Sequence, residues 1–354
     1  MALPFFNNSH RRKLDQIVAI DLGNRFTKAV HVQRRSDGLA LGGFAILDAP
    51  LYEKTMPVEL LKEHLAAVLK TLDTKAKHVA LTVGVNDAIV RHVDMPAMPD
   101  DDLRQILKNN SRTYLQQDLS GYIFDFFRGN ATAPKADAKN PGSTKQTILI
   151  AAAKNQLVDD YSKATKGAGL IADHIVPCVI GPVNAFENAF PDAWKNDVVA
   201  LVDLGFKSSS ISIVREGELG LNRVVGIGGD KLTTGLADAM SISYAEAEGI
   251  KIGMPSEVNS VLEALLIPLA RELRASMDFF EHQQDRAISR VLISGATAKS
   301  EFVLQVLRQE LGVECTTWDS TQSFKHALPP EQLAELEQVH PQLSVAIGTA
   351  LTVL

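Results

Sequence analysis

The chain has 354 residues, of which 45% are hydrophobic and 22% are charged, and its formal net charge is -6. This length exceeds one ordinary hydrophobic core and predicts two lobes or several subdomains, while the composition excludes the intrinsically disordered class. The net negative charge argues against nucleic acid as a main partner, and the sequence has no apolar run of the roughly 20 residues that a membrane span needs.

The amino terminus and the cysteine content both indicate an intracellular protein. Phe5 and Phe6 precede a basic run, which reverses the order of charge and apolar residues in a signal peptide. We therefore expect residues 1–14 to form a short arm rather than a secretion leader. Cys178 and Cys315 lack the spacing of metal ligands, and we expect both to be buried, reduced thiols.

The first predicted element is a hairpin whose plan occurs twice. VAIDLGNRFTKAVHV begins at Val18 and ALVDLGFKSSSISIV begins at Ala200; in each, an apolar run ends in Asp-Leu-Gly and resumes after a polar turn. This pattern predicts a β-hairpin with a carboxylate at its tip and a glycine that lets a ligand approach the backbone. The repeat therefore predicts two related lobes that face each other across a cleft. At this cleft Asp21 and Asp203 would suit a metal-bound polyphosphate.

The remainder of the first half predicts a lobe core over residues 15–80 and an inserted α+β subdomain over 81–177. Within the insertion, residues 129–145 are polar and irregular, which predicts a mobile hairpin tip. The strands expected after the hairpin cover 38–47, 78–85, 90–95, 122–127, 146–153 and 174–179, and the helices cover 57–72, 100–117 and 157–169.

The second half repeats this logic after a connecting helix region over residues 178–198. Its lobe, 199–354, should end in a helix over 344–354 that packs back toward the first lobe. Pro268 should either kink the long helix or mark its true start. The strands expected after the second hairpin are 217–225 and 290–294, and the helices begin near 231, 243, 258, 301 and 344.

Glycine-rich turns follow several predicted strands, where backbone amides and helix N-termini bind phosphate. They are Asp21 to Gly23, Asp203 to Gly205, Gly226 to Gly229, and Ser294-Gly295-Ala296. None has the spacing of a Rossmann or P-loop motif, so the sequence predicts a nucleotide site in some other fold.

The paired hairpins, the Gly-Gly turn and the late Ser-Gly strand resemble the phosphate and adenosine motifs of the actin-like ATPase superfamily. Within it the chain is similar to the PilM family of type IV pilus assembly proteins, relatives of the cell-division protein FtsA. This closer resemblance is carried by VDMPAMPDDDLRQILKNNSRTYL, RVVGIGGDKLTTGLA with AEAEGIK, RELRASMDFFEHQ and VLISGATAKSEFVLQVLRQELGV. It implies an α/β, actin-like ATPase fold whose two lobes enclose a nucleotide cleft.

The resemblance also implies a site for ATP and Mg2+. Asp21 and Asp203 would orient the metal through waters, and Arg274 would be the cation beside the adenine. Glu248 and Lys251, on one helix face, would contact ribose and adenine. The groups implied near the phosphates are Gly23, Asn24, Gly205 and Ser208. Gly228 and Gly229 would approach the phosphate or ribose, and Gly295 would lie against the adenosine.

The sequence departs from the family pattern at three places. Ala296 follows Gly295 where a glycine run is usual, and Phe206 and Lys207 replace small hydroxyl residues. Lys207 could pair with phosphate or occupy the phosphate site itself. We interpret Lys28 as a surface lysine of its strand rather than a phosphate ligand.

Hydrolysis requires a side chain that positions water in line with the terminal phosphate. Asn184 and Glu187 on the connecting helix are the candidates, and neither lies in a clear motif, so slow turnover or none is expected.

The resemblance implies a cytoplasmic scaffold at the inner face of the inner membrane, associated with the membrane only through partners. It would hold the cytoplasmic tail of a PilN-like membrane protein in a groove of the first subdomain and contact other platform proteins. Two alternatives remain open: a sugar or small-acid kinase of the same superfamily, and a GspL-like component of type II secretion.

Overall fold

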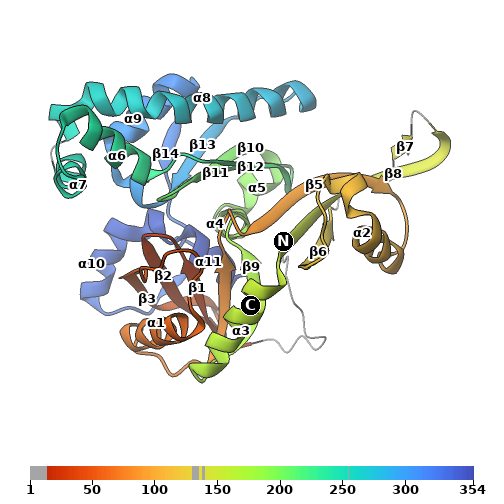
Figure 1. Ribbon diagram of the computed structural model, residues 1–354, viewed down its shortest axis with the longest axis horizontal. Helices are drawn as coiled ribbons and strands as arrows, with labels where there is room; N and C mark the ends of the chain where they lie inside the picture. Colours follow the sequence, from red (N-terminus) through yellow and green to blue (C-terminus); the bar gives the residue numbers. More distant parts are fainter. Residues whose placement is uncertain (1–13, 130–134, 138–139, 254) are drawn as a thin grey trace.

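The computed structural model describes residues 14–129, 135–137, 140–253 and 255–354. The arm predicted over 1–14, apart from its last residue, and the centre of the tip predicted over 129–145 lie outside the described residues. The described chain forms two lobes, each built on a mixed sheet, with a smaller subdomain projecting to one side (Figure 1).

The sheet of the first lobe has the strand order β15-β3-β2-β1-β4-β9. Antiparallel pairing joins β1, β2 and β3, whereas β1, β4 and β9 run parallel. The central strand β1 is buried through most of its length because helices cover both faces of the sheet. The strands are β1 (Gln16–Leu22), β2 (Phe26–Arg35), β3 (Gly38–Asp48), β4 (His78–Val83), β9 (Ile171–Pro177) and β15 (Lys325–His326).

The sheet of the second lobe repeats this plan in the order β12-β11-β10-β13-β14. A β-bulge follows His31 where β2 pairs with β3, and another follows Ile213 where β11 pairs with β12. Each bulge lies ten residues beyond the hairpin aspartate, Asp21 or Asp203. The duplication predicted from the sequence is therefore confirmed in strand order and in register. The strands are β10 (Val198–Leu204), β11 (Ser209–Arg215), β12 (Glu218–Val225), β13 (Arg290–Ser294) and β14 (Cys315–Thr317).

The inserted subdomain has its own sheet, in the order β5-β8-β6 with β7 alongside β8. This sheet packs against α2 (Asp100–Leu115) around a separate apolar cluster. Its strands are β5 (Ala88–Pro96), β6 (Tyr122–Arg128), β7 (Lys135–Asp137) and β8 (Asn140–Lys154). The inserted subdomain covers fewer residues than the predicted range 81–177. The strand β9 pairs with β4 in the first sheet, and the helix before β9 packs on the first lobe.

Helices cover the outer face of each sheet and fill the space between the sheets. α1 and α3 lie outside the first sheet, α8 and α9 lie outside the second, and α4 and α11 lie between them (Figure 1). The C-terminal helix α11 contacts β1, β2 and β4, so it packs on the first lobe. The helices are α1 (Val58–Thr71), α3 (Asn155–Gly167), α4 (Ile180–Ala189), α5 (Pro191–Asn196), α6 (Gly229–Met240), α7 (Tyr244–Gly253), α8 (Asn259–Gln284), α9 (Glu301–Leu311), α10 (Pro330–Val339) and α11 (Ser344–Ala350).

Some elements differ from the prediction. β9 begins at Ile171 rather than near residue 174, and α5, α10, β14 and β15 were not predicted. α8 starts at Asn259 and continues through Pro268, so the proline does not mark the start of the helix. Of the helices in the described part of the chain, none combines the length and apolar character that crossing a membrane requires.

Two glycines allow α4 and α11 to touch backbone to backbone between the sheets. A Cβ on Gly348 would lie 1.7 Å from the carbonyl oxygen of Gly181, and a Cβ on Gly181 would lie 2.5 Å from that of Val345. Side chains at either position would separate the helices, and with them the two lobes. Glycine is thus required here by packing rather than by an unusual backbone conformation.

We expect Gly348→Ala to lower the free energy of unfolding by about 1–3 kcal/mol, because the new methyl group overpacks a rigid backbone contact. Gly249→Ala is the matched control, since this α7 glycine has no atom within 4 Å of the added Cβ. Alanine should leave the protein there unchanged or slightly more stable. Denaturant unfolding followed by circular dichroism measures both, and equal stability of the two variants would contradict the close packing.

Candidate functional site

The two hairpins place their aspartates at corresponding positions of the two lobes. Asp21 ends the buried part of β1 and lies opposite Lys28 of β2 in the ladder; Asp203 is the penultimate residue of β10 and lies opposite Ser210 of β11. Both carboxylates therefore stand at the carboxyl end of a central strand, the edge at which ligands bind in α/β sheets. Asp21 is almost fully buried, and Asp203 is half-buried.

A hydroxyl from the neighbouring parallel strand fixes each carboxylate. Thr82 Oγ1, at the end of β4, donates to Asp21 Oδ1 at 3.1 Å, and it also accepts from the backbone N–H of Leu22. Ser294 Oγ, at the end of β13, donates to Asp203 Oδ1 at 3.0 Å. The duplicated fold thus supplies the same orienting contact on both sides of the cleft.

Lys28 pairs with Asp21, and its charge also interacts with that of Asp203. Its Nζ is 2.9 Å from Asp21 Oδ2, its side chain is only 17% exposed, and Asp203 also acts on its charge. Burial alone would lower the pKa of Lys28, but the charges of Asp21 and Asp203 raise it above its ordinary value. The expectation of a surface lysine is therefore wrong, and Lys28 is a charged member of the site.

Burial of the site acts on its other titratable groups as well. It raises the pKa of Asp203 above the ordinary value; Lys28 and the Ser294 hydrogen bond oppose this shift, while the charge of Asp21 adds to it. Burial also raises the pKa of the Cys178 thiol, and the carboxylates of Asp21 and Asp203 add to that shift. Cys178 and Cys315 are free thiols, as expected, but only Cys315 is buried, whereas Cys178 is half-buried.

Glycines line the turns beside the carboxylates. A Cβ on Gly23 would lie 2.5 Å from the carbonyl oxygen of Phe26, and one on Gly205 would lie 2.5 Å from that of Ser208. Gly295, after β13, has φ +96°, and a Cβ there would lie 2.3 Å from the carbonyl oxygen of Leu204. Glycine is therefore required at these turns, because a side chain would collide with neighbouring backbone, and turns of this kind beside carboxylates can present backbone amides to a phosphate.

The start of α6 is tied to the second hairpin. The backbone N–H of Gly229 donates to the Gly205 carbonyl and that of Asp230 donates to the Phe206 carbonyl, both at 2.9 Å. Lys207, for which phosphate pairing or occupation of the phosphate site was expected, pairs instead with Asp230 at 2.7 Å and is 54% exposed. These two helix amides are therefore engaged within the lobe.

Glu248 and Lys251 of α7 lie against this turn. Lys251 Nζ is 2.7 Å from Glu248 Oε2, 2.6 Å from Thr233 Oγ1 and 3.4 Å from the Gly229 carbonyl. Burial would raise the pKa of Glu248, but its bonds to Lys251 and Thr233 and the charges of Lys251 and Arg25 lower it. Because Arg25 belongs to the tip of the first hairpin, the pKa of Glu248 is lowered in part by a charge on the opposite lobe.

Three predicted site residues have other surroundings. Arg274 is held by Asp278, Glu281 and the Leu311 carbonyl at the end of α9, away from the Gly295 turn that precedes that helix. Asn184 is buried and its amide donates to the Gly348 carbonyl at 3.3 Å, which joins α4 to α11. Glu187, on the same helix, is half-buried, and its catalytic role stays a prediction.

The remaining predicted groups lie at the hairpin tips, with Asn24 exposed and Ser208 half-buried. Sequence reasoning missed Thr82, Ser294 and Thr233 as side chains that hold the site. Thr82 and Ser294 lie at or next to the end of apolar strands that could have been aligned with each other, whereas nothing in the sequence singles out Thr233.

The donor set fits a hydrated Mg2+ bound together with a polyphosphate. Among the described residues no group of three or more acidic, histidine or cysteine side chains could hold a metal ion. Mg2+ in such sites is typically bound by one or two carboxylates, waters and substrate phosphates rather than by a full protein cage. Asp21 and Asp203 provide such a pair beside glycine turns that can meet phosphate.

Comparison with known proteins identifies the family. The family model described as type IV pilus assembly protein PilM matches residues 19–353. The chain belongs to the PilM family.

Solved structures confirm the actin-like ATPase fold expected for this PilM-family protein. A PilM-PilN type IV pilus biogenesis complex aligns with a TM-score of 0.80 at 21% identity, covering 97% of this chain and 99% of that one. The ethanolamine utilization protein EutJ from Carboxydothermus hydrogenoformans gives 0.57 at 14% identity, covering 97% and 92%. MreB5 of Spiroplasma citri bound to AMPPNP gives 0.51 at 10% identity, covering 96% of each chain.

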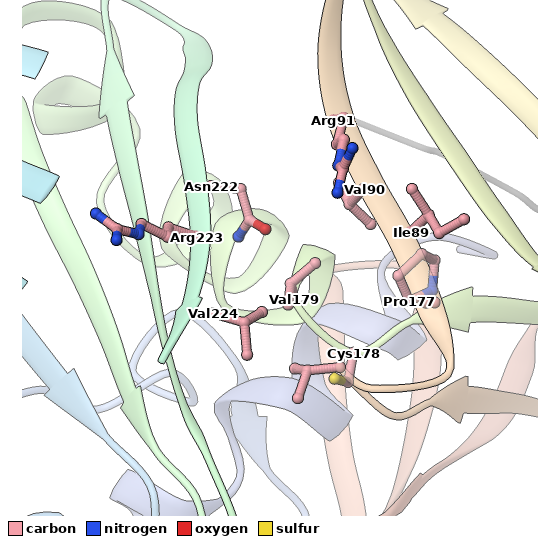
Figure 2. Close-up of a pocket in the computed structure, with 11 residues that line it drawn as sticks. Ile89, Val90, Arg91, Pro177, Cys178, Val179, Asn222, Arg223 and Val224 are labelled. Carbon is pink, nitrogen blue, oxygen red and sulfur yellow. The ribbon is translucent and has the colours of Figure 1, made fainter. Parts of the chain in front are cut away.

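The PilM-family chain also has a cavity of about 330 Å³ between the inserted subdomain and the second lobe. Figure 2 shows Ile89 and Val90 of β5 on one side, Asn222 and Val224 of β12 on the other, and Val179 between them. β5 and β12 are edge strands of their sheets. Cys178 borders this cavity and also lies within electrostatic reach of Asp21 and Asp203.

The raised pKa of Asp203 predicts that the ionised form of this carboxyl group lowers the free energy of unfolding. Because the folded protein binds this proton more tightly than the unfolded chain does, stability falls as the pH rises from the ordinary value of 3.8 through the raised one. We expect Asp203→Asn to stabilise the protein at pH 7 by about 1 kcal/mol, within the usual range for single substitutions. The gain should shrink as the pH is lowered through the raised pKa.

Unfolding curves between pH 4 and pH 8 measure this difference. Asp197→Asn is the control, because Asp197 is a 39% exposed partner of Arg290 outside the cleft and its removal should give no such gain. A destabilised Asp203→Asn protein at pH 7 would contradict the unfavourable burial of the charge.

Proposed function

We propose that this PilM-family protein is a cytoplasmic scaffold of a type IV pilus assembly platform and that it binds ATP-Mg between its lobes. The observation that carries the nucleotide role is the pair of hairpin carboxylates, Asp21 and Asp203, arranged around Lys28 and flanked by glycine turns. Relatives of the same fold support it, since the MreB5 structure is described as bound to AMPPNP.

In this proposal Asp21 and Asp203 hold the hydrated Mg2+ through waters, and Thr82 and Ser294 keep both carboxylates oriented. The hairpin turns at Gly23, Asn24, Gly205 and Ser208 face the phosphates, with Lys28 as their cation. Gly228, Gly229, Glu248, Lys251 and Gly295 form the ribose and adenosine side. A bound Mg2+ would neutralise phosphate charge and fix the phosphates relative to the two lobes.

Binding suits this cleft better than rapid hydrolysis. Asn184, one of two candidates to orient water, already bonds to Gly348 in the packing of α4 against α11. A ligand that favours one arrangement of the lobes is sufficient to switch a scaffold without turnover. We therefore propose a nucleotide-responsive protein with weak or no ATPase activity.

We propose further that the protein holds the cytoplasmic tail of a PilN-like inner-membrane protein. The similar solved structure is described as a PilM-PilN complex, and the cavity between β5 and β12 offers an apolar floor beside two edge strands. An extended peptide can add to such an edge through its backbone and place side chains in a pocket. Attachment at the inner face of the inner membrane, and contacts with other platform proteins, would follow through this partner.

The family match favours this scaffold over both alternatives, the small-molecule kinase and the GspL-like secretion component. It spans residues 19–353 and so includes both lobes and the inserted subdomain. The assignment therefore rests on the whole chain rather than on the nucleotide motifs that a kinase of the same superfamily would share.

Titration calorimetry tests the nucleotide role. Wild-type protein should bind ATP-Mg, and Asp203→Asn should weaken this binding at least tenfold, a loss of about 1.4 kcal/mol, because a neutral amide supports the hydrated cation poorly. ATP without metal should be affected less. The exposed control Asp197→Asn should bind as the wild type does, and absence of ATP-Mg binding by wild-type protein would refute the nucleotide role.

The tail site is tested by filling the cavity. Val224 borders it and is 37% exposed, so Val224→Trp should be tolerated by the fold while its ring occupies the cavity. We expect binding of a synthetic PilN-like tail peptide, followed by fluorescence anisotropy, to weaken at least tenfold. Met240→Trp, at a 42% exposed position on α6, is the control. Unchanged peptide affinity in Val224→Trp would place the tail elsewhere.

A further inference from the structure

The duplicated hairpins differ at the residue that faces the tip aspartate. In the first hairpin Asp21 lies opposite Lys28, whereas in the second Asp203 lies opposite the buried Ser210. The second lobe therefore brings a carboxylate to the cleft without a cation opposite it in its own hairpin, since Lys207 of that hairpin turn pairs with Asp230. Lys28 is the cation that pairs with Asp21 and on which the charge of Asp203 also acts.

The contacts of Lys28 place it where a metal and phosphate would meet the protein. Its Nζ is 2.9 Å from Asp21 Oδ2, while the other oxygen of Asp21 accepts from Thr82. The same Nζ lies 3.2 Å from the position that a Cβ on Gly23 would take, which puts the ammonium group beside the first glycine turn. Asp203, on the opposite lobe, attracts the same charge.

We infer that Lys28 is an internal counter-ion that excludes free divalent cations from the Asp21–Asp203 pair and makes the cleft select a metal–polyphosphate complex. The choice of polyphosphate as ligand rests on the proposed function, but the exclusion of free metal does not.

Charge and ligand number give this selectivity a physical basis. A free divalent cation would have to displace a lysine that is already paired with Asp21, and it would gain only two carboxylates in return. A metal–polyphosphate complex brings its own oxygen ligands, and its negative charge gives the displaced ammonium group a new partner. The lysine thus moves from carboxylate to phosphate as the ligand enters, and the pair becomes available to the hydrated metal.

The experiment measures Mn2+ binding in the absence of nucleotide, by electron paramagnetic resonance of the free ion. Wild-type protein should bind Mn2+ weakly, and Lys28→Met should bind it at least tenfold more tightly. Lys62→Met is the matched control, because Lys62 lies on the surface of α1 and pairs with Glu59. The double variant Lys28→Met/Asp203→Asn should lose the gained affinity, which locates the ion at the carboxylate pair.

Lys28→Gln provides a second variant in case methionine disturbs folding, since its amide can still donate to Asp21, and it should show the same gain. Equal Mn2+ affinity in wild type and in a folded Lys28 variant, or tight Mn2+ binding by wild type alone, overturns the inference. Calorimetry with ATP-Mg on the same proteins tests the proposed function separately. Loss of ATP-Mg binding in wild type would refute that function while the Mn2+ comparison still decides the role of Lys28.

Discussion

Two carboxylates that approach each other inside a protein need a cation between them, and this requirement organises the cleft. Asp21 and Asp203 come from different lobes, and Lys28 compensates both. The constraint explains why a lysine occupies a largely buried strand position. Without a charged partner, the free energy of desolvating its ammonium group would far exceed the stabilisation from the apolar contacts of its side chain. The constraint also explains the hydroxyl groups of Thr82 and Ser294, which fix each carboxylate on its own lobe.

The duplication provides the frame in which this contact is possible. Both sheets have the same strand order, and a bulge occurs at the corresponding position where the second strand of each hairpin pairs with the next strand, so the two tip aspartates lie at equivalent places. The lobes are held close by α4 and α11, which meet at Gly181 and Gly348 with no room for a side chain. The duplicated sheets position the two carboxylates. The hairpins differ in the residue opposite the aspartate, which is Lys28 in the first and Ser210 in the second, so only the first supplies a cation at this position.

Much of the fold could be predicted from the sequence, because the hairpins and the long helices have clear periodicity. Asp21, Asp203 and the glycine turns could also be found, because duplication marks them. Lys28 could not, because strand alternation alone does not tell whether a polar side chain faces solvent or a second lobe that closes over it. The prediction for Arg274 was limited in the same way. Helical periodicity indicates which face of the helix Arg274 occupies, but it does not indicate which residues of other elements lie against that face.

The short elements escaped prediction for a different reason. β14 and β15 contain three and two residues and exist because neighbouring strands offer them an edge. Such segments have almost no periodicity of their own, and tertiary contacts decide their conformation. The boundary of the insertion follows the same rule, since β9 belongs to the first lobe only because β4 is there to pair with it.

The position of Cys178 connects the cleft with the cavity between β5 and β12. The segment from the last residue of β9 onward borders the cavity through Pro177, Cys178 and Val179, and the Cys178 thiol lies within electrostatic reach of the carboxylate pair. This segment leads directly into α4, whose packing against α11 joins the lobes. A ligand at either site could influence the other only if this segment can adopt a second arrangement and the ligand binds the two arrangements with different affinity. The fold places that segment along the cavity and within electrostatic reach of the carboxylate pair.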